Sequence, residues 1–228
     1  MREGFVVVHG FGGSPLDVES IKKELEKNGV PKENIFLPIL QGHSREKRGI
    51  DFKTTYVDMV RGLKKDIKDI RKKYNKIYLI GYSMGALISM EVATEIGVDK
   101  LILLNAPMRV WHFKNFIHTI KTSRFPRKKE HIKTVLSSVS YRKILNNVEL
   151  RKLQRDIKGN MYRISSDTLI VQSKYDYVAR PSGAIKIYEM IGSKHKRIVE
   201  YNEPSHFIPS EDSVEKIIRD VYSWIYNV

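Results

Sequence analysis

Residues 76–96 read KIYLIGYSMGALISMEVATEI, and this stretch decides the fold. It predicts a short apolar strand, a tight turn with the pattern G-x-S-x-G over 81–85, and a helix over 83–96. The glycines on both sides of Ser83 relieve the backbone crowding of such a turn. A serine between a strand and a helix projects its hydroxyl above the sheet, so Ser83 is the candidate nucleophile. An ordinary glycine-rich turn is the alternative, which the flanking strand and helix disfavour.

Around this stretch, short β-branched runs alternate with longer amphipathic segments. Strands that are apolar on both faces and alternate with helices predict a parallel sheet with helices on both sides. The predicted fold class is therefore α/β, with about six mainly parallel strands. The expected strands are residues 4–9, 34–39, 76–80, 100–104, 167–172 and 196–201, and the expected helices are residues 15–28, 51–73, 83–96, 184–191 and 213–226.

The alternation breaks once, in a segment that also carries most of the charge. Residues 107–160 hold 14 Lys/Arg and 3 Asp/Glu, a net +11 of the chain's +15. We expect an α/β core over 1–106 and 161–228, with 107–160 inserted as a basic helical cap at the carboxyl edge, where such sheets bind ligands. No nucleic-acid-binding motif accompanies the charge, so no nucleic acid partner is expected. A weak contact with anionic lipid or an acidic ligand stays open, beside the alternative of a solvated surface.

The composition excludes several classes of protein. The chain has 228 residues, 41% of them hydrophobic, which suits one domain with an insertion and not a disordered chain. It has no cysteine, which excludes disulfides, thiolate catalysis and cysteine-ligated metal sites. No apolar run approaches the roughly 20 residues of a membrane-spanning helix, and the N-terminal apolar run is too short for a signal peptide. The expected compartment is the cytoplasm.

A serine hydroxyl needs a base to take its proton, and the chain offers seven histidines. His9, His43 and His206 lie at or beyond the carboxyl end of a predicted strand, and His206 fits the chain order Ser, acid, His. Between Ser83 and His206, Asp176 is the acidic residue that follows the carboxyl end of a strand. The predicted triad is Ser83, Asp176 and His206, with the aspartate orienting the histidine and stabilising its imidazolium.

If the serine attacks an acyl group, the site also needs hydrogen-bond donors for the oxyanion that develops. One candidate is the amide of Met84, the residue after the nucleophile. The other comes from the loop HGFGG at residues 9–13, where the amide of Phe11 is our choice. This loop lacks both the spacing G-x-G-x-x-G and the lysine of phosphate-binding loops. We expect no metal and no cofactor.

These motifs, in this order, resemble an α/β-hydrolase, and the chain is most similar to the small carboxylesterase and monoacylglycerol-lipase group of bacteria. The resemblance implies an acyl-enzyme that water resolves and a small helical cap that contacts the acyl or alcohol chain. It gives Ser83, Asp176 and His206 the triad roles, and Phe11 and Met84 the oxyanion hole. The matching stretches are HGFGG (9–13), LPILQGH (37–43), GYSMG (81–85), NAPM (105–108), SKYDYV (173–178) and SHFIP (205–209).

The leading expectation is a carboxylesterase, a serine hydrolase of short- to medium-chain acyl esters, with monoacylglycerols among the plausible substrates. Met108, Trp111 and Phe113 would line an acyl pocket, or else pack the core of the cap; both interpretations stay open. The first alternative is an acyl thioesterase acting on coenzyme A or carrier-protein thioesters, because the same triad would serve. The second is a non-catalytic protein that binds anionic partners through the insertion. The oligomeric state is left undetermined.

Overall fold

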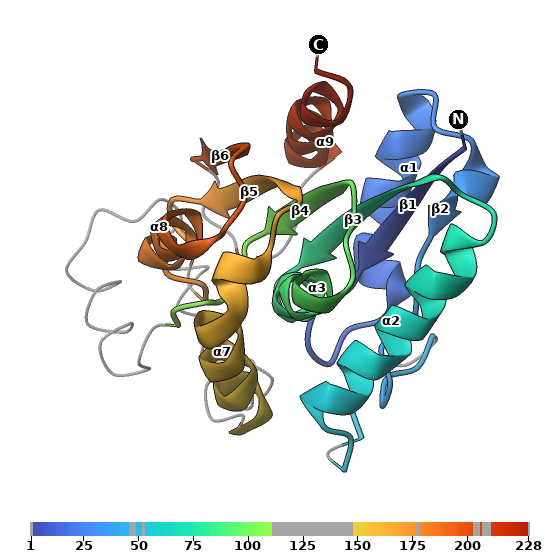
Figure 1. Cartoon of the computed structure of the whole chain (residues 1–228). Helices are drawn as coiled ribbons and strands as arrows, with labels where there is room; N and C mark the ends of the chain where they lie inside the picture. Colours follow the sequence, from blue (N-terminus) through green and yellow to red (C-terminus); the bar gives the residue numbers. More distant parts are fainter. Residues whose placement is uncertain are drawn as a thin grey trace.

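The computed structural model describes residues 2–45, 49–51, 53–110, 148–176, 178–202, 206 and 211–227. In these ranges the chain forms one β-sheet with helices packed on both faces (Figure 1). No helix in these ranges is both long and apolar enough to cross a membrane.

In the described part of the chain, the sheet has six parallel strands in the order β2-β1-β3-β4-β5-β6. β3 lies in the middle, where Ile80 pairs with Val7 of β1 on one side and with Ile102 of β4 on the other. The predicted fold class is confirmed, and the G-x-S-x-G turn leaves the sheet near the centre of its carboxyl edge. The strands are β1 (Glu3–Val8), β2 (Ile35–Phe36), β3 (Lys76–Tyr82), β4 (Lys100–Leu104), β5 (Asp167–Ser173) and β6 (Lys196–Tyr201).

β2 is much shorter than the sequence predicted. The strand expected over 34–39 contains only Ile35 and Phe36. A 3-10 turn, η2 (Lys32–Asn34), occupies the residues before it. Pro38 follows, and a proline has no N–H to donate to a β-ladder. The predicted position of the strand was right and its predicted length was wrong.

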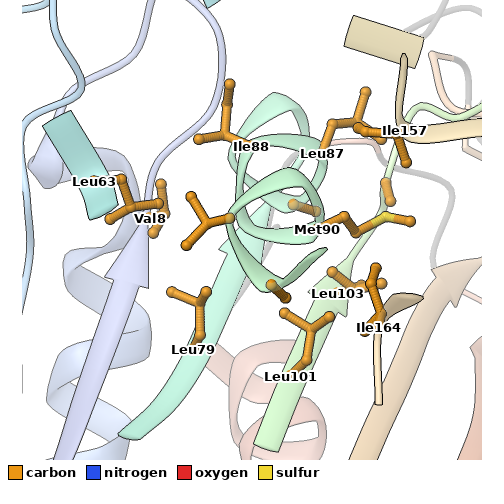
Figure 2. Close-up of a cluster of buried hydrophobic side chains, with 14 of the residues drawn as sticks. Val8, Leu63, Leu79, Leu87, Ile88, Met90, Leu101, Leu103, Ile157 and Ile164 are labelled. Carbon is orange, nitrogen blue, oxygen red and sulfur yellow. The ribbon is translucent and has the colours of Figure 1, made fainter. Parts of the chain in front are cut away.

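Two hydrophobic clusters, one on each face of the sheet, hold the helices. Residues of β1 alternate between them: Val6 and Val8 lie in the larger cluster, and Phe5 and Val7 in the smaller. The larger cluster includes α2, α3, α7 and α8, and part of it is drawn in Figure 2, whereas α1 and α9 pack into the smaller one. The helices are η1 (Pro15–Val18), α1 (Glu19–Lys27), α2 (Tyr56–Arg71), α3 (Met84–Glu95), α7 (Val148–Asn160), η3 (Met161–Arg163), α8 (Pro181–Met190) and α9 (Glu211–Tyr226).

α2 begins later than predicted because a capping residue fixes its first turn. The helix was expected over 51–73 but starts at Tyr56. The hydroxyl of Thr55 accepts a hydrogen bond from the N–H of Asp58 at 3.2 Å, and the Asp58 carboxylate accepts one from the N–H of Thr55 at 3.1 Å. This reciprocal capping box satisfies two N–H groups and sets the start of the helix.

α7 belongs to the core of the sheet, although it falls inside the predicted insertion 107–160. Leu150, Leu153 and Ile157 are buried and lie in the same cluster as Leu87 of α3 (Figure 2). The structure therefore packs residues 148–160 against α3. The remainder of the predicted cap, residues 111–147, lies outside the described residues.

Both described ends of this segment are joined to the core. On the N-terminal side, Val110 forms an antiparallel bridge with Ala179. On the C-terminal side, Glu149 accepts a hydrogen bond from the N–H of Tyr56 at 3.1 Å, and the Tyr56 hydroxyl donates to Asp156. α7 is thus tied to α2 by polar contacts as well as to α3 by apolar packing.

We expect Ile157→Ala to lower the free energy of unfolding by about 2–5 kcal/mol, because it removes a fully buried side chain and leaves a cavity against α3. Urea denaturation followed by circular dichroism measures the change. Lys158→Ala is the matched control on the same helix, since Lys158 is exposed and should cost less than about 0.5 kcal/mol. Equal, small effects of both substitutions would contradict the placement of α7 in the core.

Candidate active site

Ser83 lies in the turn between β3 and α3 with a strained backbone. Its φ of 53° and ψ of −124° are rare for a residue with a side chain. Two glycines make the turn possible: a Cβ at Gly81 would lie 2.5 Å from the Cα of Ala86, and a Cβ at Gly85 would collide with the carbonyl oxygen of His9. The turn holds the Ser83 side chain at the carboxyl edge of the sheet.

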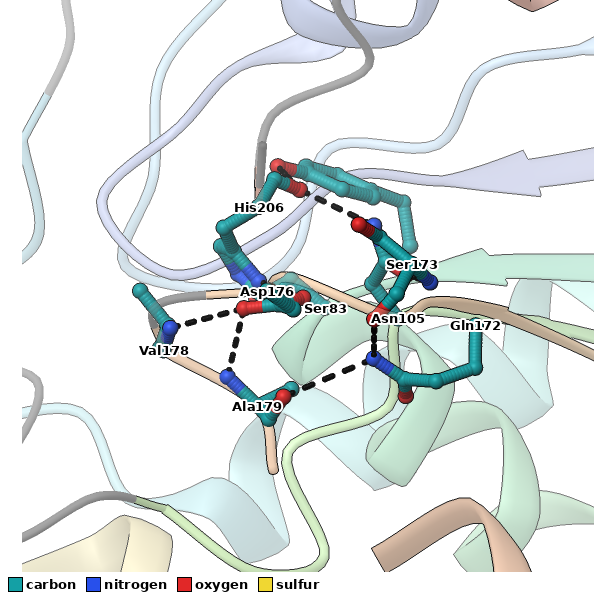
Figure 3. Close-up of polar contacts among 9 residues, drawn as sticks. Ser83, Asn105, Gln172, Ser173, Asp176, Val178, Ala179 and His206 are labelled. Carbon is teal, nitrogen blue, oxygen red and sulfur yellow. Dashed lines mark hydrogen bonds and ion pairs between the residues drawn. The ribbon is translucent and has the colours of Figure 1, made fainter. Parts of the chain in front are cut away.

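The structure brings Ser83, His206 and Asp176 together. The Ser83 Oγ lies 2.7 Å from the His206 Nε2, and the His206 Nδ1 lies 2.8 Å from the Asp176 Oδ2 (Figure 3). The exposed fractions of the three residues are only 7%, 2% and 1%, respectively. Since Nδ1 faces a carboxylate, it carries the proton in the neutral ring, which leaves the lone pair of Nε2 toward the serine hydroxyl.

The Asp176 carboxylate is itself held by backbone donors. Its Oδ1 accepts hydrogen bonds from the N–H groups of Val178 and Ala179, both at 2.7 Å (Figure 3). Donors of this kind fix the orientation of the carboxylate. The second oxygen, Oδ2, is left to face His206.

His206 is anchored through its backbone carbonyl, which the sequence analysis did not foresee. This oxygen accepts from the Tyr82 hydroxyl at 3.0 Å and from the Asn105 Nδ2 at 3.1 Å. Asn105 also accepts, through Oδ1, from the N–H of Ser173 at 2.8 Å, and so connects the ends of β4 and β5 with His206 (Figure 3). The signal in the sequence was that Asn105 directly follows a strand at the edge where the candidate residues gather.

The two residues nominated for an oxyanion hole are each next in the chain to a residue of this turn or of the loop beside it. Met84 is the first residue of α3, where N–H groups have no partner within the helix. Phe11 follows Gly10, at which an added Cβ would lie 3.1 Å from the Cβ of Ser83 and 3.6 Å from its Oγ. The loop after β1 therefore runs directly beside the serine.

Comparison with known proteins gives the family. A model of the family Hydrolase_4, described as serine aminopeptidase, S33, matches residues 1–213. The chain belongs to this family.

The relatives agree with the predicted resemblance. The chain is 21% identical to a carboxylesterase of Bacillus subtilis (strain 168), over 96% of this chain and 91% of the relative. It is 24% identical to a thermostable monoacylglycerol lipase of Bacillus sp. (strain H-257), over 89% of this chain and 82% of that protein.

Solved structures share the fold. A structure of the metagenome-derived lipolytic enzymes LipS and LipT superposes with a TM-score of 0.75 at 17% identity, covering 100% of this chain and 94% of that one. A monoacylglycerol lipase of Paleococcus ferrophilus gives 0.71 at 14% identity, covering 97% and 93%. The chain is an esterase- or lipase-type α/β-hydrolase, as the sequence motifs predicted.

Of the predicted pocket residues, the structure describes only Met108. Its side chain is buried in the larger hydrophobic cluster, beside Gly183 of α8. Trp111 and Phe113 lie outside the described residues. A cavity of about 590 Å³ over α2 and α3 and another of about 680 Å³ beside β2 are lined by other residues. The acyl pocket stays a prediction.

Metal ligation has no support in the described ranges, where no group of three or more His, Asp or Glu residues is arranged to hold an ion.

His9 is a fully buried histidine beside the candidate site. Its Nε2 accepts a hydrogen bond from the N–H of Leu40 at 3.2 Å, and its Nδ1 lies 2.9 Å from the carbonyl oxygen of Gly10. Burial, with a smaller contribution from the neighbouring His43, lowers the pKa of His9 to about 4, against the raising effects of the Gly10 carbonyl and of Asp17. The ring is therefore neutral in the folded protein at neutral pH, with the proton on Nδ1.

Folding stability should depend on the ionisation of His9. The unfolded chain binds a proton there near pH 6.5 and the folded chain only near pH 4, so stability is fully present above 6.5 and is lost as the pH falls toward 4. Over this window the loss should be about 3 kcal/mol. In chemical denaturation from pH 7 to pH 4, His9→Asn should flatten the pH dependence by this amount. His195→Asn, at an exposed histidine, should follow the wild type. Parallel curves for His9→Asn and wild type would show that the ring does not resist protonation.

Proposed function

We propose that this chain hydrolyses carboxylic esters through an acyl-enzyme on Ser83. The observation that carries the proposal is the 2.7 Å contact between the Ser83 Oγ and the His206 Nε2, in a chain of Asp, His and Ser that is almost fully buried. Membership of an α/β-hydrolase family supports it, as do relatives named carboxylesterase and monoacylglycerol lipase.

In the acylation step, the Ser83 Oγ forms a bond with the ester carbonyl carbon while its proton moves to the His206 Nε2. Asp176 stays ionised and stabilises the imidazolium through Nδ1–H. The tetrahedral intermediate then collapses, the alcohol leaves with the proton from Nε2, and the acyl group remains on Ser83. In deacylation, a water molecule gives its proton to Nε2 and attacks the acyl carbon, and the reverse proton transfer releases the acid and free Ser83.

The negative charge of the tetrahedral oxygen would be held by the amides of Phe11 and Met84. Supporting this assignment, Met84 offers an N–H at the positive end of α3, and the loop that contains Phe11 runs beside Ser83. Such donors stabilise the transition state more than the ground state, which is what raises kcat.

The substrates we propose are short- to medium-chain acyl esters, monoacylglycerols among them. The monoacylglycerol lipase among the relatives supports this class. In this proposal the insertion within 107–160 caps the site, with Trp111 and Phe113 contacting the acyl chain and α7 joining the cap to the core. Thioesters of coenzyme A remain the alternative, because the same residues would serve.

We expect Ser83→Ala to lower kcat by about 10⁴- to 10⁶-fold, because the hydroxyl that forms the acyl-enzyme is removed. The measurement is hydrolysis of p-nitrophenyl esters from acetate to palmitate. Ser165→Ala is the matched control: it removes an exposed hydroxyl just before β5, at the opposite edge of the sheet, and should keep wild-type rates.

Two further substrates separate the chemistries. An acyl-coenzyme A series tests the thioesterase alternative, and aminoacyl p-nitroanilides test the aminopeptidase activity in the family's description. Ester turnover that survives in Ser83→Ala would refute the nucleophile. Turnover of acyl-coenzyme A well above that of esters would indicate a thioester substrate, while the assignment of the triad would stand. A wild type inactive on all three would point to the non-catalytic alternative.

A further inference from the structure

Two loops at the carboxyl edge of the sheet are joined by a reciprocal pair of histidines. One loop follows β1 and contains His9; the other follows β2 and contains His43. The His9 Nε2 accepts from the N–H of Leu40 in the second loop at 3.2 Å, and the His43 Nε2 accepts from the N–H of Gly12 in the first loop at 3.1 Å. Each histidine thus accepts a hydrogen bond from the backbone of the other's loop. The two rings pack edge to face, with their centroids 4.9 Å apart.

These contacts are made by the backbone groups on both sides of the Phe11 amide. The carbonyl of Gly10 belongs to the same planar peptide as the Phe11 N–H, so fixing its direction fixes the N–H in the opposite direction. The Gly10 oxygen accepts from the His9 Nδ1 at 2.9 Å and from the N–H of Gly13 at 3.2 Å. One side of Phe11 is therefore oriented by His9.

The other side of Phe11 depends on His43. The next N–H in the chain, that of Gly12, donates to the His43 Nε2, and the carbonyl of Gly12 accepts from the N–H of Gly49 at 2.9 Å. Gly12 has a φ of +63°, which glycine adopts without the steric cost that a Cβ would bring. Without the acceptor on His43, the N–H of Gly12 loses its partner, and only the Gly12 carbonyl still holds the first loop to the second at this point, through Gly49.

Both histidines must be neutral to accept these hydrogen bonds. Burial lowers the pKa of His43 as well as that of His9, against smaller raising effects of the Gln41 and Leu40 carbonyls on His43. Within the described residues, the titratable groups that face the pair are the two rings themselves and Asp17, which acts on His9. The His43 Nδ1 lies 3.3 Å from the carbonyl oxygen of Gln41, so Nδ1 carries the proton and Nε2 is free to accept.

We infer that His43 is a positioning residue for the oxyanion hole, which orients the Phe11 amide through Gly12 and the reciprocal contact with His9. The inference rests on the proposed function. It assigns catalytic importance to a residue of the loop after β2 that lies outside the predicted triad.

His43→Phe tests this inference, since it keeps a flat ring against His9 and removes the acceptor for Gly12. His43→Gln is the conservative variant, because its amide oxygen can accept from the same N–H. His195→Phe controls for the loss of a histidine at an exposed position. Each variant is assayed for kcat and KM on the best p-nitrophenyl ester, for the rate and final extent of Ser83 labelling by a fluorophosphonate, and for inhibition by a trifluoromethyl ketone.

His43→Phe should lower kcat by about 10- to 100-fold with KM changed less than threefold, since the loss of one oxyanion donor outright costs about 10²- to 10³-fold. The inhibition constant of the ketone, whose adduct with Ser83 carries an oxyanion, should rise in parallel. The final extent of labelling should stay near complete, which shows a folded site. His43→Gln should recover most of kcat, and His195→Phe should match the wild type.

The inference is overturned if His43→Phe keeps wild-type kcat and ketone inhibition, or if kcat falls only in proportion to an incomplete final labelling. Failure of the proposed function looks different: the wild type then hydrolyses no ester. In that case the labelling rate still decides, because phosphonylation of Ser83 uses the same amides. A rate that is equal in wild type and His43→Phe, or no labelling of the wild type at all, rejects the inference.

Discussion

The structure depends on how closely α3 approaches the end of β1. Gly85 lies so near the backbone oxygens of Val8 and His9 that a Cβ there would collide with both. This approach forces the tight turn at Ser83 and its positive φ, which costs on the order of 1–3 kcal/mol. The apolar surface of α3 offsets the strain: ten of its twelve residues are buried, so the helix cannot withdraw from the sheet without exposing most of itself.

The same approach organises the site. With α3 seated against β1, the serine faces the loop that follows β1, and the Ser83 side chain, the first N–H of α3 and the Phe11 loop meet at one place. The other two residues of the predicted triad follow β5 and β6, the strands that lie beyond β4 in the sheet. Asp176 follows β5 and His206 follows β6, so their relative positions are set by strand order and not by local sequence.

Much of the candidate site could be predicted from the sequence, because the carboxyl ends of parallel strands lie at one edge of the sheet. A parallel sheet puts every loop that follows a strand at one edge, and this rule, with the G-x-S-x-G turn and the chain order Ser, acid, His, selected Ser83, Asp176 and His206. The anchoring role of Asn105 and the pairing of His43 with Gly12 could not be predicted, because each joins backbone groups of loops far apart in the chain.

α7 shows what a sequence pattern alone does not predict. Its apolar residues recur at helical spacing, which predicts a helix but does not say what the helix packs against. The break in the alternation of strands and helices, together with the charge of the segment, therefore placed it in the cap, whereas Leu153 and Ile157 pack it against α3. The predicted length of β2 was wrong for a local reason. Pro38 ends the β-ladder inside an otherwise apolar run.

The anchoring of the chain on both sides of residues 111–147 has a consequence for evolution. Val110 is joined to the Asp176 loop through Ala179, and α7 is joined to α2 and α3, so both junctions are fixed by the core. Changes in length or sequence between these two junctions therefore need not disturb the contacts among Ser83, Asp176 and His206. Substrate preference could then diverge while the residues around Ser83 remain unchanged.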